Sequence, residues 1–479
     1  MDSQRDVLEL ENDMSLKCLV PLGIVVTLGL TGCAPTGVES VRPAFRPLEQ
    51  DVSLYQPPLR PFSAPPITAP PETPTDVLTL RQALALALVQ NPELSAFSWE
   101  VRAAEARTLQ AGLRPNPELG LEVENVAGTG ALRGRRSAET TLRLSQVIEL
   151  GGKRTMRLRV AALERDLATW DYETKRVEVL TAVAQAFVEV LRAQERLETE
   201  KDLVQLAEQV LATVAERVSA GKVSPVEETK AGVALSTSRV ALERARRELV
   251  ATKQRLVATW GSSTPTFQKV EGAFETVATP PSAEALAERI LDNPDVARWG
   301  TELQQRQAAV DLAEAQKVPD LTAGGGVRYL NEAAAAALVF AFSVPLPVVN
   351  RNQGVILEAH HRLAKAGEER RAAVVRVRAA LATAYATLTA AFAEATTLRE
   401  ESLPGARRVF EATSEGYRQG KFSLLDVLDA QRTLFEAKEQ YIEALATYHK
   451  AVAEAERLLG GELTTVMGLT GPHSHGAPR

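Results

Sequence analysis

The sequence predicts a mainly α-helical protein with a small β part. The expected fold is a long α-helical barrel built from a duplicated helix–strand–strand–helix repeat, with four strands in each chain. Three observations predict it: helical periodicity covers most of the chain, two pairs of short segments alternate with a period of two, and three motifs recur at nearly one spacing. Aromatic residues make up only 5% of the 479 residues and alanine is abundant, which favours long helices over a sheet-rich core.

An internal duplication relates the two halves of the chain. Gly221-Lys-Val-Ser matches Gly420-Lys-Phe-Ser, and the two glycines are 420 − 221 = 199 residues apart. Two further matches, each at a spacing of 202 residues, pair Asn91-Pro92 with Asn293-Pro294 and Pro117-Glu-Leu with Pro319-Asp-Leu. Three matches at nearly one spacing indicate a repeated unit.

The N-terminus has the pattern of an export signal. Residues 1–32 form the signal peptide region, with Met14 as an alternative true start, because Lys17 precedes an apolar run from Leu19 to Leu30. That run is shorter than the roughly 20 residues of a membrane-spanning helix. It ends in Leu-Thr-Gly-Cys33, which resembles the lipidation motif of bacterial lipoproteins and makes Cys33 the predicted acylated residue. The alternative is a plain secretory signal with an incidental cysteine.

Residues 33–75 are rich in proline and read as a lipid-anchored, extended segment, and residues 462–479 as a flexible tail. The only other cysteine, Cys18, lies within the signal, so we expect no disulfide and no cysteine metal site. A net charge of −6 argues against a nucleic-acid partner. The sequence contains no glycine-rich phosphate-binding loop, no His-Glu-x-x-His zinc motif and no Cys-x-x-Cys redox motif. We therefore expect that the protein is not an enzyme and that it has no cofactor and no metal site.

Two repeats fill the region between these segments. Repeat 1 spans residues 76–264, and its first helical pattern runs from Leu80 to Leu113. It continues with a β-hairpin at 118–149, a long helix at 154–218 and a helix at 225–260. Repeat 2 spans residues 265–461, with a first helix, a hairpin at 320–346, a long helix at 353–417 that Pro404-Gly405 can kink, and a helix at 424–460.

The hairpins have the pattern of membrane-crossing strands. Leu119, Leu121 and Val123 alternate with polar residues, and each of the four strands is about 9 residues long, the length of a strand in a transmembrane barrel. The polar face would line a lumen, for which the candidates are Glu122, Glu124, Arg143 and Arg328. The alternative is two hairpins packed on a soluble helical body.

Four strands cannot close a barrel. An open sheet edge in hydrocarbon leaves backbone groups unpaired at several kcal/mol each. If the hairpins face lipid, several chains must therefore share one barrel, and three chains give 12 strands around an aqueous passage. On that condition the strand pattern predicts a homotrimer in contact with membrane lipid.

The end of each repeat carries a turn followed by a heptad seam. Ser423 can cap the helix that follows, and small residues alternate with large ones along it, beginning with Val427, Ala430 and Leu434. The first copy places Leu235 and Leu242 in the same register. Alanine in alternate layers lets a partner helix approach closely, as in the wall of a helical tube.

These motifs resemble those of TolC-family outer-membrane efflux channels across residues 76–461. The resemblance is carried by Arg114-Pro-Asn-Pro-Glu-Leu, by Leu144-Ser-Gln-Val-Ile-Glu-Leu-Gly-Gly-Lys-Arg154 and by Gly416-Tyr-Arg-Gln-Gly-Lys-Phe-Ser-Leu-Leu-Asp-Val-Leu-Asp-Ala-Gln431. The first two are most similar to the heavy-metal branch, which exports cobalt, zinc and cadmium or copper. The resemblance implies the exit duct of a tripartite efflux pump, with a periplasmic adaptor protein and an inner-membrane RND-type transporter as partners. It also implies an outer-membrane location with a long periplasmic extension.

The resemblance also suggests a gate at the helical tip. Asp426 and Asp429, three residues apart, share one helical face and would form stacked carboxylate rings in a trimer. The alternative is that both are first-turn carboxylates favoured by the helix dipole. Tyr417 and Glu227 match a tyrosine and an acidic partner that hold the family's gate closed, whereas the family's basic clamp residue near Phe422 is missing and Lys421 is adjacent.

The same resemblance implies adaptor contact at the tip turns, whose residues are Gly221, Lys222, Gly420 and Lys421. Other interpretations stay open on the sequence alone. They are a multidrug or type I secretion exit duct of the same family, and a helical lipoprotein with a structural role and no pore.

Overall fold

The computed structural model describes residues 76–461, which form part of one compact unit. The predicted signal region, Cys33, the proline-rich segment and the C-terminal tail lie outside these residues. The first half contains β1 (Val77–Thr79), α1 (Leu80–Gln90), α2 (Pro92–Ala111), β2 (Glu118–Glu124), the short helix η1 (Gly130–Leu132), β3 (Glu139–Ile148), α3 (Lys153–Ser219) and α4 (Pro225–Ala258).

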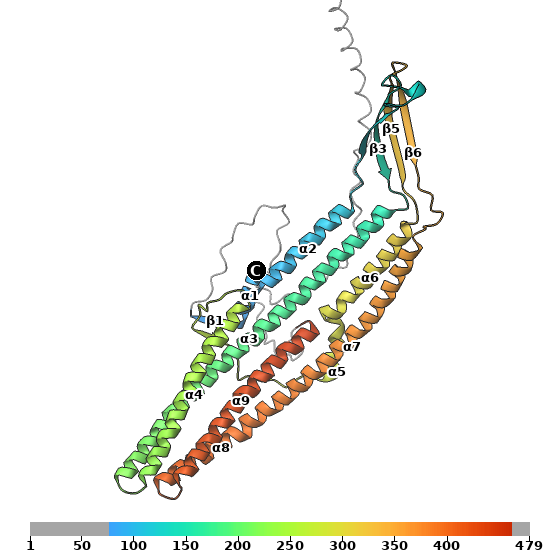
Figure 1. Ribbon diagram of the computed structural model, residues 1–479. Coiled ribbons are helices and arrows are strands. Elements are labelled where there is room, and N and C mark those ends of the chain that lie inside the picture. The colour runs from blue at the N-terminus through green and yellow to red at the C-terminus, as the bar shows by residue number, and fades with distance from the viewer. Residues whose placement is uncertain (1–75, 462–479) are drawn as a thin grey trace, which may run out of the picture. The chain divides into compact units, whose positions relative to one another are not determined.

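The second half repeats this order with additions. It contains β4 (Lys269–Glu271), α5 (Ala283–Ala287), η2 (Glu288–Asp292), α6 (Pro294–Ala315), β5 (Leu321–Leu330), β6 (Ala335–Ser343), α7 (Gln353–Thr397), the π-helix η3 (Leu398–Ser402), α8 (Leu403–Arg418) and α9 (Leu424–Leu459). In Figure 1 the hairpins lie at one end of the helices, and the α3–α4 and α8–α9 turns lie at the other end. The predicted fold class, mainly α with four strands in two hairpins, is confirmed.

Two helical stretches differ from the sequence prediction. The pattern from Leu80 to Leu113 is two helices, because Asn91 adopts an extended conformation before Pro92 and caps the second one. The stretch from 353 to 417 is interrupted by η3. Pro404 lacks the N–H that would bond to the carbonyl of Glu400, and the widened π turn directly precedes it. By contrast, α3 is a single helix of 67 residues, about 100 Å long.

The four longer strands form one antiparallel sheet in the order β2-β3-β5-β6. Leu121 pairs with Leu142, which pairs on its other side with Val327, and Val327 pairs with Leu338. The hairpins of the two repeats therefore join edge to edge through β3 and β5. A second sheet, the parallel pair β1 and β4, has three residues in each strand, and the sequence pattern did not reveal it.

The duplicated Asn-Pro motifs perform the same task in both repeats. Asn91 accepts a hydrogen bond from the N–H of Leu94 at 2.8 Å and donates to the carbonyl of Thr259, at the end of α4, at 2.7 Å. Asn293 accepts from Asp295 N–H at 2.8 Å and donates to the carbonyl of Leu458, at the end of α9, at 2.9 Å. Each motif thus starts one helix and satisfies an otherwise unpaired carbonyl at the end of another.

Ionic contacts connect the sheet to the helices at the start of α3. Lys153 Nζ lies 2.7 Å from Asp320 Oδ1, and Arg157 donates to both carboxylate oxygens of Glu149 at 2.6 and 3.1 Å. Lys153 and Glu149 belong to the Leu144–Arg154 motif. Glu149 directly follows β3 and Asp320 directly precedes β5, so the two contacts tie both strands to α3.

The heptad seams form the packed interior of the helical part. The seam residues buried in α4 and α9 include Ala231, Leu235, Ser238, Leu242, Ala245, Val427, Ala430, Leu434, Ala437, Ala444, Tyr448, Ala451, Ala455 and Leu458. Within the described residues, no helix combines the length and the apolarity that crossing a membrane requires.

Candidate functional site

The two tip turns have the same local structure. Gly221 and Gly420 have φ angles of +64° and +76°, in the left-handed region that glycine adopts without strain. Lys222 N–H donates to Arg217 O at 2.9 Å, and Lys421 N–H donates to Gly416 O at 2.7 Å. These bonds are the six-to-one contacts of a Schellman motif, so each long helix ends by a defined turn. All four predicted adaptor-contact residues, Gly221, Lys222, Gly420 and Lys421, are exposed on these turns.

Tyr417 connects three helices near the tips. Its side chain is only 4% exposed and packs with Val214, Leu424 and Val427. The Tyr417 hydroxyl donates to Glu227 Oε2 at 3.0 Å, which joins α8 to α4. Burial, followed by the hydrogen bond to Glu227, raises the pKa of Tyr417 to about 12, so the phenol keeps its proton and remains the donor. The structure thus brings together the two residues that the resemblance pairs.

Arg217 of α3 completes this cluster, and the sequence analysis missed it. Its guanidinium carbon lies 4.4 Å from the centroid of the Tyr417 ring, and its Nη1 donates to the Tyr417 carbonyl oxygen. Arg217 thus places a basic group against Tyr417 from the other tip, 200 residues away in the sequence. Arginine over an aromatic face is a favourable cation–π contact, worth about 0.5–2 kcal/mol.

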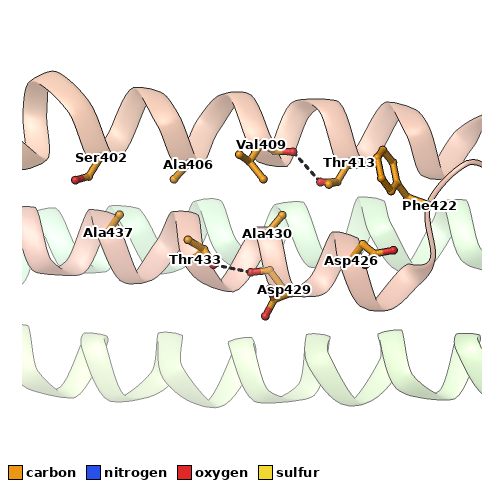
Figure 2. Close-up of a pocket in the computed structure, with 10 residues that line it drawn as sticks. All are labelled: Ser402, Ala406, Val409, Thr413, Phe422, Asp426, Asp429, Ala430, Thr433 and Ala437. Carbon is orange, nitrogen blue, oxygen red and sulfur yellow. Dashed lines mark hydrogen bonds between the residues drawn. The ribbon is translucent and has the colours of Figure 1, made fainter.

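Asp426 and Asp429 line one cavity of about 430 Å³ between α8 and α9. Figure 2 shows both aspartates on α9, with Val409 and Thr413 on the facing helix and Phe422 at the end where the turn begins. The Phe422 ring lies directly against Gly416. A Cβ at position 416 would be 2.2 Å from the Phe422 ring, so glycine leaves room for this side chain.

The two aspartates have different partners. Asp426 accepts hydrogen bonds from the Ser423 N–H at 2.8 Å and the Ser423 hydroxyl at 2.7 Å. The Asp426 N–H donates in return to the Ser423 hydroxyl oxygen at 3.3 Å, which completes a capping box. The Ser423 hydroxyl, followed by its backbone N–H, lowers the pKa of Asp426. Asp429 accepts from Arg432 Nη2 at 2.7 Å and is 63% exposed. Asp426 therefore has the capping role of the first-turn interpretation, while both carboxylates also border the cavity.

The lumen-lining candidates share one face of the sheet. Register places Glu122, Glu124, Arg143 and Arg328 on the face opposite to Leu121, Leu142 and Val327. Arg143 Nη2 lies 2.8 Å from Glu122 Oε2, and Arg328 Nη2 lies 3.1 Å from Glu124 Oε2. The opposite face is apolar and exposed, with Leu119, Leu121, Leu338, Phe340 and Phe342 each more than two-thirds exposed.

The resemblance points to metal export, which raises the question of a metal site. Among residues 76–461, no three histidine, cysteine or acidic side chains gather as a metal site requires.

Comparison with known proteins gives a consistent picture. The family model described as "Outer membrane efflux protein" matches residues 83–262 and 285–461, one match in each repeat. The cobalt-zinc-cadmium resistance protein CzcC of Cupriavidus metallidurans is 36% identical over 384 residues, covering 80% of this chain and 90% of CzcC. The pyoverdine export outer membrane protein OpmQ of Pseudomonas aeruginosa is 24% identical over 412 residues, covering 80% of this chain and 85% of OpmQ.

A solved structure supports the fold. The crystal structure of CusC, a protein that undergoes conformational changes accompanying folding and transmembrane channel formation, superposes with a TM-score of 0.69 at 18% identity. The match covers 80% of this chain and 92% of CusC. At that identity the likeness concerns the arrangement of helices and strands.

Proposed function

The chain belongs to the outer membrane efflux protein family, and from this premise we propose that it is the exit duct of a tripartite pump for divalent transition-metal cations. Family membership confirms the resemblance drawn from the tip and strand motifs. Members of the family are passive outer-membrane channels and not enzymes. They form homotrimers and work with adaptor and transporter proteins. The specific adaptor and the RND-type transporter, like the lipid anchor at Cys33, belong to the proposal.

The similarity to CzcC is the observation that supports metal cations as the cargo. It extends over 90% of CzcC at 36% identity, whereas the likeness to the pyoverdine exporter is 24% identical. The metal is thus the better-supported cargo, and a small organic molecule is the second candidate.

In the proposed duct the sheet spans the outer membrane. Its apolar face would contact lipid, its charged face would line the water-filled lumen, and β2 and β6 would pair with neighbouring chains to close a 12-stranded barrel. The helices would continue the passage into the periplasm. Two features support this orientation: the separation of apolar and charged residues onto opposite faces, and the outer edges of β2 and β6, which pair with no further strand among residues 76–461.

At the tips, the Arg217–Tyr417–Glu227 cluster would hold the duct closed. It connects α3, α8 and α4, so α8 and α9 cannot move away from the first helical pair without breaking it. Asp426 and Asp429 would then surround a narrow opening and attract cations.

The cargo is tested in the producing bacterium. Deletion of the gene is expected to raise sensitivity to Zn²⁺, Co²⁺ and Cd²⁺, and the intact gene is expected to restore resistance. Unchanged metal tolerance together with increased sensitivity to organic compounds would favour the second candidate. The gate is tested by planar-bilayer conductance of the purified protein, in which Asp426→Ala with Asp429→Ala should reduce the preference for cations. An unchanged preference would contradict the carboxylate rings.

A further inference from the structure

Every charged side chain of the four-stranded sheet lies on the same face. The register of the ladders places Glu118, Glu122, Glu124, Glu139, Arg143 and Arg328 together. The strands carry four carboxylates and two guanidiniums, so the face has a charge of 2 − 4 = −2 in each chain. Which carboxylates the two arginines pair with determines which of them are available to bind a passing cation.

Arg328 is the centre of the larger group. From β5 its Nη1 lies 2.9 Å from Glu139 Oε2 on β3, and its Nη2 lies 3.1 Å from Glu124 Oε2 on β2, two strands away. Its Nε donates to the hydroxyl of Thr141, a residue that is 1% exposed, at 3.0 Å. All three sides of the guanidinium are thus engaged, which fixes its position between two carboxylates.

Arg143 makes a second, smaller pair. Its Nη2 lies 2.8 Å from Glu122 Oε2. Three of the four carboxylates on this face, Glu122, Glu124 and Glu139, therefore have a guanidinium within 3.1 Å. A divalent cation that approaches them meets oxygens already engaged by a fixed positive charge.

Without the arginines, this face would suit divalent cations. Carboxylate oxygens bind such ions with an affinity that rises with the number of carboxylates in reach. Glu124 and Glu139 both approach one guanidinium and would be left as a pair of acceptors. A duct that retained its cargo at such a place would be blocked by it, since conduction requires binding weak enough for the ion to leave.

We propose that Arg143 and Arg328 act as built-in cations that occupy the carboxylates of the lumen face, so that divalent metal ions pass the outer-membrane part of the duct without being retained. The proposal rests on the proposed function, because it takes the charged face as the lumen. It assigns to the two arginines a role in preventing ion retention, separate from the attraction of cations by the aspartates at the tips.

The test is zinc block of the current through single trimers in planar bilayers. The parent protein carries Asp426→Asn and Asp429→Asn, which removes the tip carboxylates that could themselves bind Zn²⁺. Adding Arg143→Gln and Arg328→Gln to this parent is expected to lower the half-blocking Zn²⁺ concentration by about tenfold or more. Further replacement of Glu122, Glu124 and Glu139 by Gln should return the sensitivity to that of the parent.

A matched control uses an arginine of the helical part. Arg371 of α7 lies 2.7 Å from Glu368, so Arg371→Gln removes one positive charge from an ion pair outside the sheet and should leave zinc block unchanged. If Arg328→Gln impairs assembly, Arg143→Gln alone can be used, because it breaks only the exposed pair with Glu122. It should also lower the half-blocking Zn²⁺ concentration, by a smaller factor.

Two results would overturn the proposal in distinguishable ways. An equal zinc sensitivity of the parent and of the arginine variants, or a block that persists after the three glutamates are replaced, would refute the role of the arginines while the duct stands. A parent protein with no conductance, even after Tyr417→Phe is added to release the tip cluster, would refute the duct and with it the placement of the lumen face.

Discussion

Tyr417 is held at the tips by contacts with two other helices, α4 and α3. Its hydroxyl bonds Glu227, its carbonyl accepts from Arg217, and its ring lies beneath the same guanidinium. One residue of α8 is thus held by α4 and α3 together.

Tyr417→Phe is expected to weaken the closed tip. It removes a hydrogen bond to a charged acceptor, which contributes about 1.5–3 kcal/mol, and leaves the Glu227 carboxylate with one fewer donor. Single-channel recording should show a larger conductance or more frequent opening. Tyr441→Phe on α9 is the control and should leave gating as it is, and equal conductance for Tyr417→Phe and the unmodified protein would contradict the clamp.

Glu200 of α3 predicts a pH dependence of stability. It is 5% exposed, and burial, followed by the nearby Glu439 carboxylate, raises its pKa. A carboxyl with a raised folded-state pKa stabilises the fold below its unfolded pKa, and this contribution is lost as the pH rises through the folded-state pKa.

Glu200→Gln should therefore raise the thermal unfolding temperature more at pH 8 than at pH 5. Unfolding of the detergent-solubilised protein, followed by circular dichroism, measures the difference. Glu198→Gln, an exposed residue of the same helix, should give no such trend. A Glu200→Gln shift that is the same at both pH values would rule out the proposed linkage.

Among the helices, the duplicated asparagines Asn91 and Asn293 show that the two repeats share local structure as well as sequence. Asn91 and Asn293 each cap a helix that begins with proline, and each bonds to the end of the last long helix of its repeat. The two are 7% and 1% exposed, so the groups that they satisfy are shielded from water.

Asn91→Ala and Asn293→Ala should each destabilise the protein by about 2–4 kcal/mol. Loss of the cap costs about 1 kcal/mol, and a buried carbonyl left without a donor costs a further 1–3 kcal/mol. Chemical denaturation of the trimer measures the effect. Ser282→Ala, at the exposed cap of the short helix α5, should cost much less, and a similar loss for all three variants would show that the tie to the distant helix end contributes nothing.

For the assembled protein, the two faces of the sheet predict its orientation in the membrane. Phe340 and Ala341 are neighbours on β6, and the ladder with β5 places them on opposite faces, the apolar and the charged one.

Phe340→Lys should impair insertion and trimer formation, because a lysine facing lipid near the bilayer midplane costs about 2–4 kcal/mol. Ala341→Lys should assemble normally, since its side chain would face water. Trimer yield in outer-membrane fractions measures both variants. Equal yields, or the reverse order, would contradict the proposed orientation.

Local patterns were sufficient to predict most elements. Strand alternation, heptad spacing and turn chemistry act over a few residues, so the hairpins, the long helices and the capped turns could be read directly from the sequence. The break at Asn91-Pro92 and the π turn before Pro404 were missed or only approximated, because the helical pattern continues across both.

The sequence by itself determined the repeat and the mainly helical fold with two hairpins, and the resemblance to a known family paired Tyr417 with Glu227. The tertiary structure alone revealed Arg217 over Tyr417, the bridge from Arg328 to Glu124 across two strands, and the β1–β4 pair. The physical reason is separation along the chain. These contacts join residues that only the packing of one repeat against the other brings within a few ångströms, and no local periodicity encodes that distance.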